Sequence, residues 1–275
     1  MLRTRVATAV VLAAVFLGAL FFLPPPGWTI FALAVAVAAA YEWAGFARLQ
    51  VPARIAYAVV TAAFAGALAW AGNLPAGEWR ATELTPVYVV AGAFWALGAV
   101  VWLIRLPQSP SAPLVLMLGW LVLIPVVLAL VQLRNAGAIP LLMLMVIVWI
   151  ADIAAYFSGR AFGKVKLAPR ISPGKSWEGV FGAFAATTAY ALLWHTFAPG
   201  LLPPLPSALS GLLGFLGLVW VLTGASVVGD LFESALKRQA GLKDSGQLLP
   251  GHGGVLDRID ALTPVLPIAA LIVTW

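Results

Sequence analysis

The segment from Ser234 to Asp260 concentrates side chains that can do chemistry. Within these 27 residues the sequence SALKRQAGLKDSGQLLPGHGGVLDRID carries eight charged or imidazole groups, although the whole chain is 63% hydrophobic. Charges beside hydrophobic helices are costly unless they face water, a metal ion or a highly charged ligand. The segment therefore indicates a phosphate-handling site at a membrane surface. The eight residues are Lys237, Arg238, Lys243, Asp244, His252, Asp257, Arg258 and Asp260.

A helix running out of the preceding apolar segment would carry a polar face into this site. Ser226, Asp230, Glu233 or Ser234, and Lys237 follow one another at spacings of three and four, so they share one side of a helix. Asp230 would then lie at the membrane edge. The alternative is a solvated helix end, held by contacts within the helix and by basic residues that only mark the membrane boundary.

The glycines around His252 can adapt the backbone to an anion. Gly251, Gly253 and Gly254 permit positive φ angles and let main-chain N–H groups approach a phosphate closely. A turn that needs glycines for its shape alone is the alternative.

Acidic residues follow directly. Asp257 and Asp260 would open the final helix, where acids also act as caps, but capping accounts for only part of this charge. Carboxylates without cysteine or several histidines suit Mg²⁺, which bridges one or two carboxylates to substrate phosphates.

A second charged cluster lies upstream, between Asp152 and Gly179. Asp152 sits deep in an apolar run, where a carboxylate needs a partner such as Arg160 or a metal ion. A buried structural ion pair is the alternative. The remaining candidates for binding a substrate in this cluster are Ser172, Lys175, Ser176 and Glu178.

The elements that must position these clusters are membrane helices. Only 9% of the 275 residues are charged and the mean hydropathy is +1.01, whereas a soluble domain carries roughly 25% charged residues. The sequence predicts an all-α, polytopic integral membrane protein with about nine transmembrane helices and two cytoplasmic polar loops. The predicted spans are Val6 to Leu23, Trp28 to Phe46, Ile55 to Ala71, Val87 to Ile104, Leu114 to Leu133, Ala138 to Phe157, Val180 to Phe197, Ala208 to Val228 and Ala261 to Trp275.

The basic residues fix the expected orientation. With the N-terminus inside, 14 of the 16 lysines and arginines fall in inside segments, so both polar loops are expected in the cytoplasm. The expected location is the inner membrane. Residues 1–275 form one membrane domain, with residues 1–150 as a hydrophobic helical scaffold and residues 151–275 as the catalytic part. The net charge of +6 is divided among short loops, so no nucleic-acid partner is expected. The absence of cysteine excludes disulfides and thiolate metal sites.

These motifs together resemble the phosphatidate cytidylyltransferase, or CDP-diacylglycerol synthase, family. Upstream of the main motif, Gly229-Asp230, Glu233-Ser234, Ser172-Pro173 and Asp152 also resemble the pattern of this family. The main resemblance lies in Ser234-x-Leu236-Lys237-Arg238, then Lys243-Asp244-x-Gly246, then Leu249-Pro250-x-His252-Gly253-Gly254-Val255-x-Asp257-Arg258-Ile259-Asp260.

The resemblance implies that CTP and phosphatidic acid react to give CDP-diacylglycerol and pyrophosphate, with Mg²⁺ as cofactor. CTP, phosphatidic acid and the lipid bilayer are the implied partners, and a homodimer is a further expectation. Asp230 and Asp257 are the expected metal ligands, supported by Asp244 or Asp260. The expected phosphate-binding and substrate-binding residues are Lys237, Arg238, Lys243, Arg258, His252, Gly253 and Gly254 for the nucleotide, and Asp152, Arg160, Ser172, Lys175, Ser176, Glu178 and Ser234 in the rest of the site.

Two other functions compete with this interpretation. A CTP-dependent kinase of a lipid alcohol would use a related nucleotide site but would transfer the γ-phosphoryl group. An ion-coupled transporter would use Asp152 and Asp230 as a cation path, and it leaves the dense polar loop unexplained.

Overall fold

The computed structural model describes residues 2–273, with side chains from residue 6 onward, and most of these residues are helical. The helices are α1 (Leu2–Phe22), α2 (Pro25–Phe46), α3 (Val51–Ala71), α4 (Thr85–Ala93), α5 (Ala99–Arg105), α6 (Ala112–Ala136), α7 (Ala138–Phe162), α8 (Trp177–Phe197), α9 (Ser207–Ser210), α10 (Leu212–Ala240), α11 (Leu256–Ile259) and α12 (Leu262–Val273). A π-helical turn, Phe94–Gly98, joins α4 to α5.

Proline and glycine set several of the helix boundaries. Helices α2, α3 and α6 each have proline in the first turn, where its missing N–H is not needed for an intrahelical bond. Helix α10 ends at Gly241, whose φ of 78° is the left-handed conformation that favours glycine at a helix C-terminus. The apolar runs between these boundaries therefore become long helices.

Six helical stretches among the described residues are long and apolar enough to cross a membrane, which supports an all-α, multi-pass membrane protein. They are Pro25–Phe46, Val51–Ala71, Thr82–Arg105, Ala112–Ala136, Ala138–Phe162 and Leu212–Ala240. The predicted count of nine spans is not confirmed. The apolar part of α1, Val6–Phe22, is shorter, and α8 is not among the six.

The last predicted span, Ala261 to Trp275, is the clearest difference, although residues 274–275 lie outside the described residues. Helix α12 has 12 residues, which rise about 18 Å, whereas the hydrocarbon core of a bilayer is about 30 Å thick. Most of its side chains are buried, and it packs against α4, α6 and α10. In the described part of the chain, α12 is a core helix surrounded by protein.

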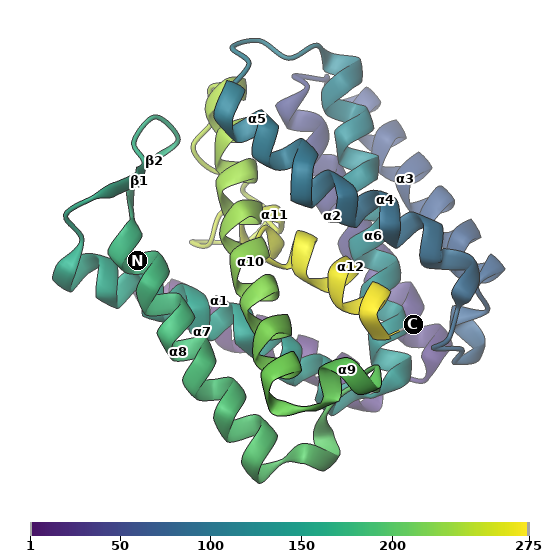
Figure 1. The fold of residues 1–275 in the computed structure, drawn as a ribbon. Coiled ribbons are helices and arrows are strands. Elements are labelled where there is room, and N and C mark those ends of the chain that lie inside the picture. The colour runs from purple at the N-terminus through teal and green to yellow at the C-terminus, as the bar shows by residue number, and fades with distance from the viewer. Residues whose placement is uncertain (1, 274–275) are drawn as a thin grey trace.

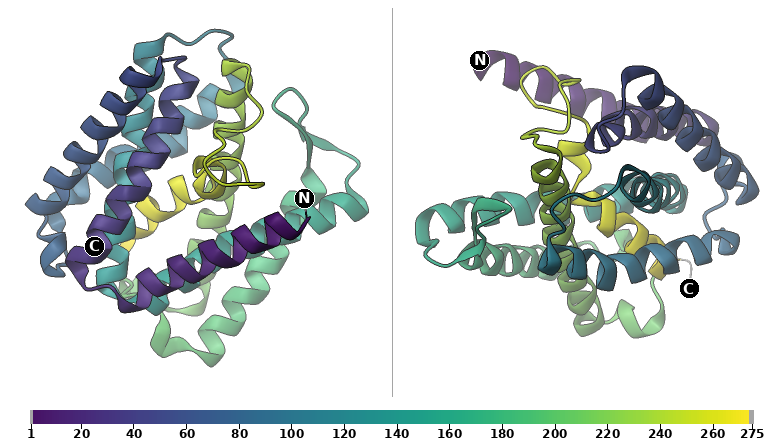
Figure 2. Two further views of the ribbon diagram at one scale, coloured as in Figure 1. Left: turned by 180° about the vertical axis from the view of Figure 1, so that it is seen from behind. Right: turned by 90° about the horizontal axis from the view of Figure 1, so that it is seen from above.

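Helix α10 lies between two groups of helices (Figure 1). On one side, α7 and α8 pack together and α8 packs on α10; on the other, α2, α3 and α6 pack on one another. Helix α1 lies on the outside of the bundle (Figure 2). It reaches the segment after α10 through Thr8, whose hydroxyl donates to the Pro250 carbonyl at 3.1 Å.

The first polar segment forms a β-hairpin, which the all-α prediction missed. Strands β1 (Lys166–Ala168) and β2 (Ser172–Ser176) pair in antiparallel fashion with Lys166 opposite Ser176. The hairpin projects from the end of α7 and leads directly into α8 (Figure 1). It therefore carries Ser172, Lys175 and Ser176 on a small ordered sheet, where irregular loop had been expected.

The basic loops gather at one end of the bundle. Arg48, between α2 and α3, donates to the Gln239 carbonyl near the end of α10 at 3.4 Å. Ser109, between α5 and α6, lines a small cavity together with Arg48 and Gln239. Arg134 instead contacts the carbonyls of Leu20 and Leu23 beyond the other end of α6. Arg48 and Arg134, predicted to lie on opposite sides of the membrane, therefore fall at different ends of the bundle, and the orientation itself stays a prediction.

Candidate active site

The two predicted polar loops, Ser158 to Gly179 and Gly229 to Asp260, meet around one cavity between α7, β2, α8 and α10, which we call the α10 cavity. It has a volume of about 420 Å³ and mixes apolar walls with charged side chains from both segments. Six residues predicted for the site line it: Asp152, Arg160, Ser172, Lys175, Ser176 and Asp230.

Two contacts hold the polar segments together. The Lys175 ammonium on β2 forms an ion pair with the Asp230 carboxylate on α10, and both side chains are about one-quarter exposed. Arg238 donates from Nε to the Ile171 carbonyl at 3.3 Å and from Nη1 to the Leu242 carbonyl at 3.4 Å. Arg238 therefore ties the hairpin to the segment after α10, so its guanidinium has a structural task as well as its predicted phosphate-binding one.

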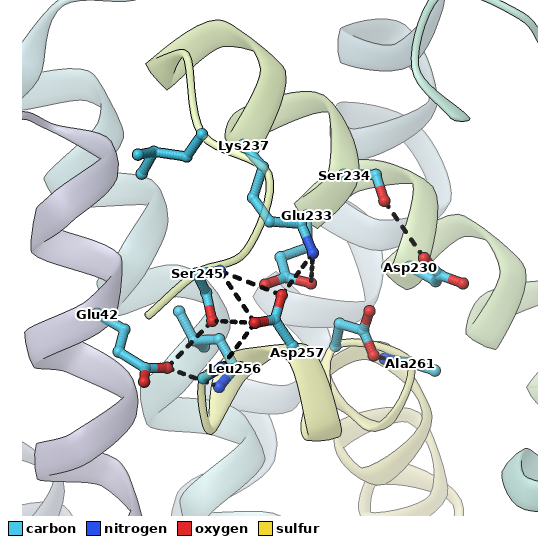
Figure 3. Close-up of polar contacts among 12 residues, drawn as sticks. Glu42, Asp230, Glu233, Ser234, Lys237, Ser245, Leu256, Asp257 and Ala261 are labelled. Carbon is cyan, nitrogen blue, oxygen red and sulfur yellow. Dashed lines mark hydrogen bonds and ion pairs between the residues drawn. The ribbon is translucent and has the colours of Figure 1, made fainter. Parts of the chain in front are cut away.

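Asp257 is the centre of a buried hydrogen-bond network (Figure 3). Its carboxylate accepts from Lys237 Nζ at 2.7 Å, from the Ser245 N–H at 3.0 Å and from the Gly254 N–H at 2.8 Å. The Ser245 hydroxyl, 2.9 Å from Asp257, shares its one proton between Asp257 and Glu42. Burial by itself would raise the pKa of Asp257, but these donors hold it below the ordinary value. Asp257 is therefore ionised at neutral pH and organises the loop around it.

Lys237 joins this network to α10. Its ammonium also contacts Glu233 Oε2 at 3.1 Å, so one cation lies between two carboxylates. The side chains of Lys237, Glu233 and Asp257 are 11%, 4% and 7% exposed, which makes the triad a buried ionic cluster. The Glu233 carboxyl also contacts the carboxyl of Asp260.

The glycine-rich loop, residues 241–255, folds into a tight turn around His252. The His252 N–H donates to the Leu249 carbonyl at 2.9 Å, and the Leu249 N–H donates to the Gly253 carbonyl at 3.0 Å. Gly253 has a φ of 81°, and a Cβ there would lie 2.7 Å from an Asp257 oxygen. The Gly254 N–H, expected to meet a phosphate, donates to Asp257 instead. In this arrangement Gly253 serves the shape of the turn, and the role of the glycines in phosphate binding stays a prediction.

Asp152 and Asp230 line the α10 cavity, and Asp260 is close enough to interact electrostatically with both. Burial raises the pKa of Asp260 to about 6, and the negative charge of Asp230 adds to the shift. Asp152 and Arg258 are close enough to interact electrostatically with each other. Excess negative charge of this kind favours a bound cation.

The donor set fits Mg²⁺ in a limited way. Within residues 2–273, no three His, Cys, Asp or Glu side chains are grouped as a ready metal site. Mg²⁺ often needs only one or two protein carboxylates, because substrate phosphates and water complete its coordination. Asp230 is open to the cavity and would exchange the Lys175 ammonium for the metal ion, so it fits this role. Asp257 would have to exchange one of its present donors for the metal ion.

Several predicted residues make local structural contacts. Ser176 caps α8 by accepting from the Gly179 N–H at 3.3 Å, and Glu178 accepts from the Val165 N–H at 3.1 Å. Ser234 donates to Asp230 at 3.4 Å. These contacts stabilise the hairpin and α10, and leave the predicted roles of the three residues in substrate binding as predictions.

Lys243 and Asp244 do not join the α10 cavity. They line a second, wider cavity of about 790 Å³, which we call the α2 cavity, together with Arg48, Arg54 and Glu42. The glycine-rich loop contributes to its wall. Of the predicted triphosphate-binding residues, Lys243 lines the α2 cavity and none lines the α10 cavity.

Glu42 is the residue of this region that the sequence did not reveal. At the end of an apolar run it was indistinguishable from a stray charge at a span boundary. It is 2% exposed and accepts from the Ser245 hydroxyl at 3.2 Å and from the Leu256 N–H at 2.9 Å (Figure 3). Its partners lie more than 200 positions away in the chain, so no local pattern could have indicated them.

Comparison with known proteins gives consistent matches over most of the chain. The sequence profile of the cytidylyltransferase family matches residues 3–275. A phosphatidate cytidylyltransferase of Haemophilus influenzae is 40% identical over 97% of this chain and 96% of its own length. One of Pseudomonas aeruginosa is 42% identical over 98% of this chain and 96% of its own. One of Thermotoga maritima is 42% identical over half of each chain.

Proposed function

Because the chain belongs to the cytidylyltransferase family, we propose that it is a phosphatidate cytidylyltransferase, which converts CTP and phosphatidic acid into CDP-diacylglycerol and pyrophosphate. The observation that carries this proposal is the junction of the two polar segments at Lys175 and Asp230, inside a cavity with apolar walls. A charged pocket within a membrane bundle suits an amphiphilic phosphate substrate.

The proposed reaction needs little acid–base chemistry. An oxygen of the phosphatidic acid phosphate attacks the α-phosphorus of CTP and forms a new P–O bond, while the bond to the β-phosphate breaks and pyrophosphate leaves. The attacking phosphate is already an anion, so positioning and neutralisation of charge should dominate the catalysis.

The lipid phosphate is best accommodated by the cations of the α10 cavity. Lys175 and Arg160 line it, and Ser172 can add a hydroxyl donor. Close by on α7, the side chains of Tyr156 and Phe157 are about 60% exposed, which gives acyl chains an apolar surface beside the charged pocket.

The nucleotide phosphates would be held at the acidic and basic groups around α10 and α11. Asp230, with Asp257 as the predicted second ligand, would hold Mg²⁺, which when bound neutralises the triphosphate and the leaving pyrophosphate. Lys237 holds Asp257 in place, and the exposed Arg258 is free to face an incoming anion.

The same charges support a location and an orientation. The inside loops predicted from charge contain 14 of the 16 basic residues, and the contacts of Arg48, Ser109 and Gln239 gather such loops at one end of the bundle. We therefore propose a multi-pass protein of the inner membrane with this end in the cytoplasm, where CTP is available.

The decisive experiment is to incubate detergent-solubilised protein with α-labelled CTP, phosphatidic acid and Mg²⁺. Label should enter the lipid phase and pyrophosphate should appear. At low Mg²⁺ concentration Asp230→Asn should slow this transfer strongly, whereas Gly200→Ala, after α8 and away from the α10 cavity, should not, because an added Cβ there has no atom within 4 Å. Lipid phosphate and CDP as products would instead show a lipid kinase and overturn the proposal.

A further inference from the structure

Glu42 belongs to none of the segments expected to carry catalysis, yet its carboxylate is bonded to two parts of the catalytic region. Oε2 accepts from the Ser245 hydroxyl in the glycine-rich loop and from the Leu256 N–H at the start of α11. A carboxylate that is 2% exposed is costly to bury without such donors. The buried position of the Glu42 carboxylate therefore requires the hydrogen-bond donors of Ser245 and Leu256.

Two glycines allow this close approach. A Cβ added to Gly246 or to Gly254 would overlap the Glu42 carboxylate. Neither residue has a positive φ, so the absence of a side chain is needed here for space and not for backbone conformation. The loop thus folds closely around the Glu42 side chain on α2.

The contact continues into the proposed active site. The Ser245 hydroxyl that contacts Glu42 also lies 2.9 Å from Asp257, and Asp257 binds Lys237 at 2.7 Å. Lys237 in turn contacts Glu233 on α10. An unbroken series of contacts therefore runs from α2 through the loop to α10 (Figure 3).

We propose that Glu42 is a positioning residue, which anchors the glycine-rich loop to α2 and thereby holds Asp257 and Lys237 in the geometry that cytidylyl transfer requires. The role depends on where one oxygen atom accepts hydrogen bonds and not on a negative charge. Both bonds end on Oε2, an atom that the amide oxygen of glutamine reproduces. The kinetic consequence rests on the cytidylyltransferase activity proposed above.

The test compares Glu42→Gln, Glu42→Ala and Ser245→Ala, with Gln132→Ala as a matched control. Gln132 is likewise fully buried and anchors a distant segment, through Tyr88 and the Trp79 carbonyl, but near the opposite end of the bundle. For each protein, kcat and KM for CTP and for phosphatidic acid are measured. Hydrogen exchange of residues 243–256 and the thermal midpoint are measured on the same samples.

Glu42→Ala should lower kcat/KM for CTP by about 100-fold, as expected when reacting groups shift by about 1 Å, and should speed exchange in the loop. Glu42→Gln should stay within about threefold of the unmodified protein, since both hydrogen bonds persist. Gln132→Ala should lower the thermal midpoint while leaving the KM for CTP and exchange in the loop unchanged.

Three results would overturn the inference: a Glu42→Gln protein as impaired as Glu42→Ala, unchanged exchange in Glu42→Ala, or an equal kinetic loss in Gln132→Ala. If Glu42→Ala does not accumulate, Ser245→Ala provides the test. Wild-type turnover and wild-type hydrogen exchange in Ser245→Ala would show that the contact between Glu42 and the loop is dispensable. If the unmodified protein makes no CDP-lipid, the proposed function fails, whereas hydrogen exchange still tests the anchor.

Discussion

Replacing Lys237 by methionine should destabilise this protein far more than removing an exposed lysine. Lys237 lies between Glu233 and Asp257, at 3.1 and 2.7 Å, and all three side chains are at most 11% exposed. Methionine fills similar space without charge, so two buried carboxylates would be left near each other without their shared cation.

The structure gives the expected order of effects. Removing one partner of a buried ion pair costs about 3–5 kcal/mol, and Lys237→Met should fall in this range. Asp257→Asn leaves the contact between Lys237 and Glu233 intact and weakens only the hydrogen bonds at residue 257, which should cost about 2 kcal/mol. The double variant has one buried charge fewer than Lys237→Met, so its loss should be smaller than the sum by about 1–3 kcal/mol.

A double-mutant cycle measures this coupling. The free energy of unfolding of the four proteins is determined in one detergent by denaturant titration, with the exposed Lys166→Met as a control expected within about 0.5 kcal/mol of the unmodified protein. Additive losses for Lys237→Met and Asp257→Asn would refute the idea that the two side chains stabilise each other.

The remaining predictions concern the hairpin, the glycine-rich loop and the metal ion. Gly253→Ala should cost about 1–3 kcal/mol, because residue 253 has φ 81° and its Cβ would meet Asp257; thermal unfolding beside Gly174→Ala checks this, and equal midpoints would contradict it. Ser176→Ala should lose about 1 kcal/mol by removing the cap of α8, whereas Ser176→Thr should restore it in the same assay. Asp230→Asn should raise the Mg²⁺ concentration for half-maximal turnover by about tenfold or more, because loss of even a residue that only orients a metal ligand weakens metal binding by about tenfold. An unchanged Mg²⁺ titration would show that Asp230 does not bind the metal ion.

Much of the helical architecture could be predicted from the sequence, because lipid-facing and core-facing residues are both apolar and leave long hydrophobic runs. The same uniformity hides which runs cross the membrane. Helix α12 is as apolar as a span but is short and surrounded by protein. Burial against neighbouring helices depends on packing, which hydropathy does not encode.

The site was predictable only where its contacts lie within one helix. The spacing of Asp230, Ser234 and Lys237 placed them on one face of α10, and both Ser234 with Asp230 and Lys237 with Glu233 are in contact there. The partners of Lys175 and Glu42 could not be predicted from spacing, because they come from segments far along the chain. Local periodicity determines a face, and only tertiary packing determines what that face meets.

The division of charge between the two cavities bears on how a lipid and a nucleotide can meet. The α10 cavity has mainly apolar walls around Lys175 and Asp230, and exposed Ile153, Tyr156 and Phe157 lie on α7 beside it. The α2 cavity is wider and more polar, and the glycine-rich loop contributes to its wall. Asp257 and Lys237 are held by this same loop and by α10, so they lie between an environment that suits acyl chains and one that suits a soluble anion. The hydrogen bonds of Ser245 in this loop to Asp257 and Glu42 hold the loop in that place.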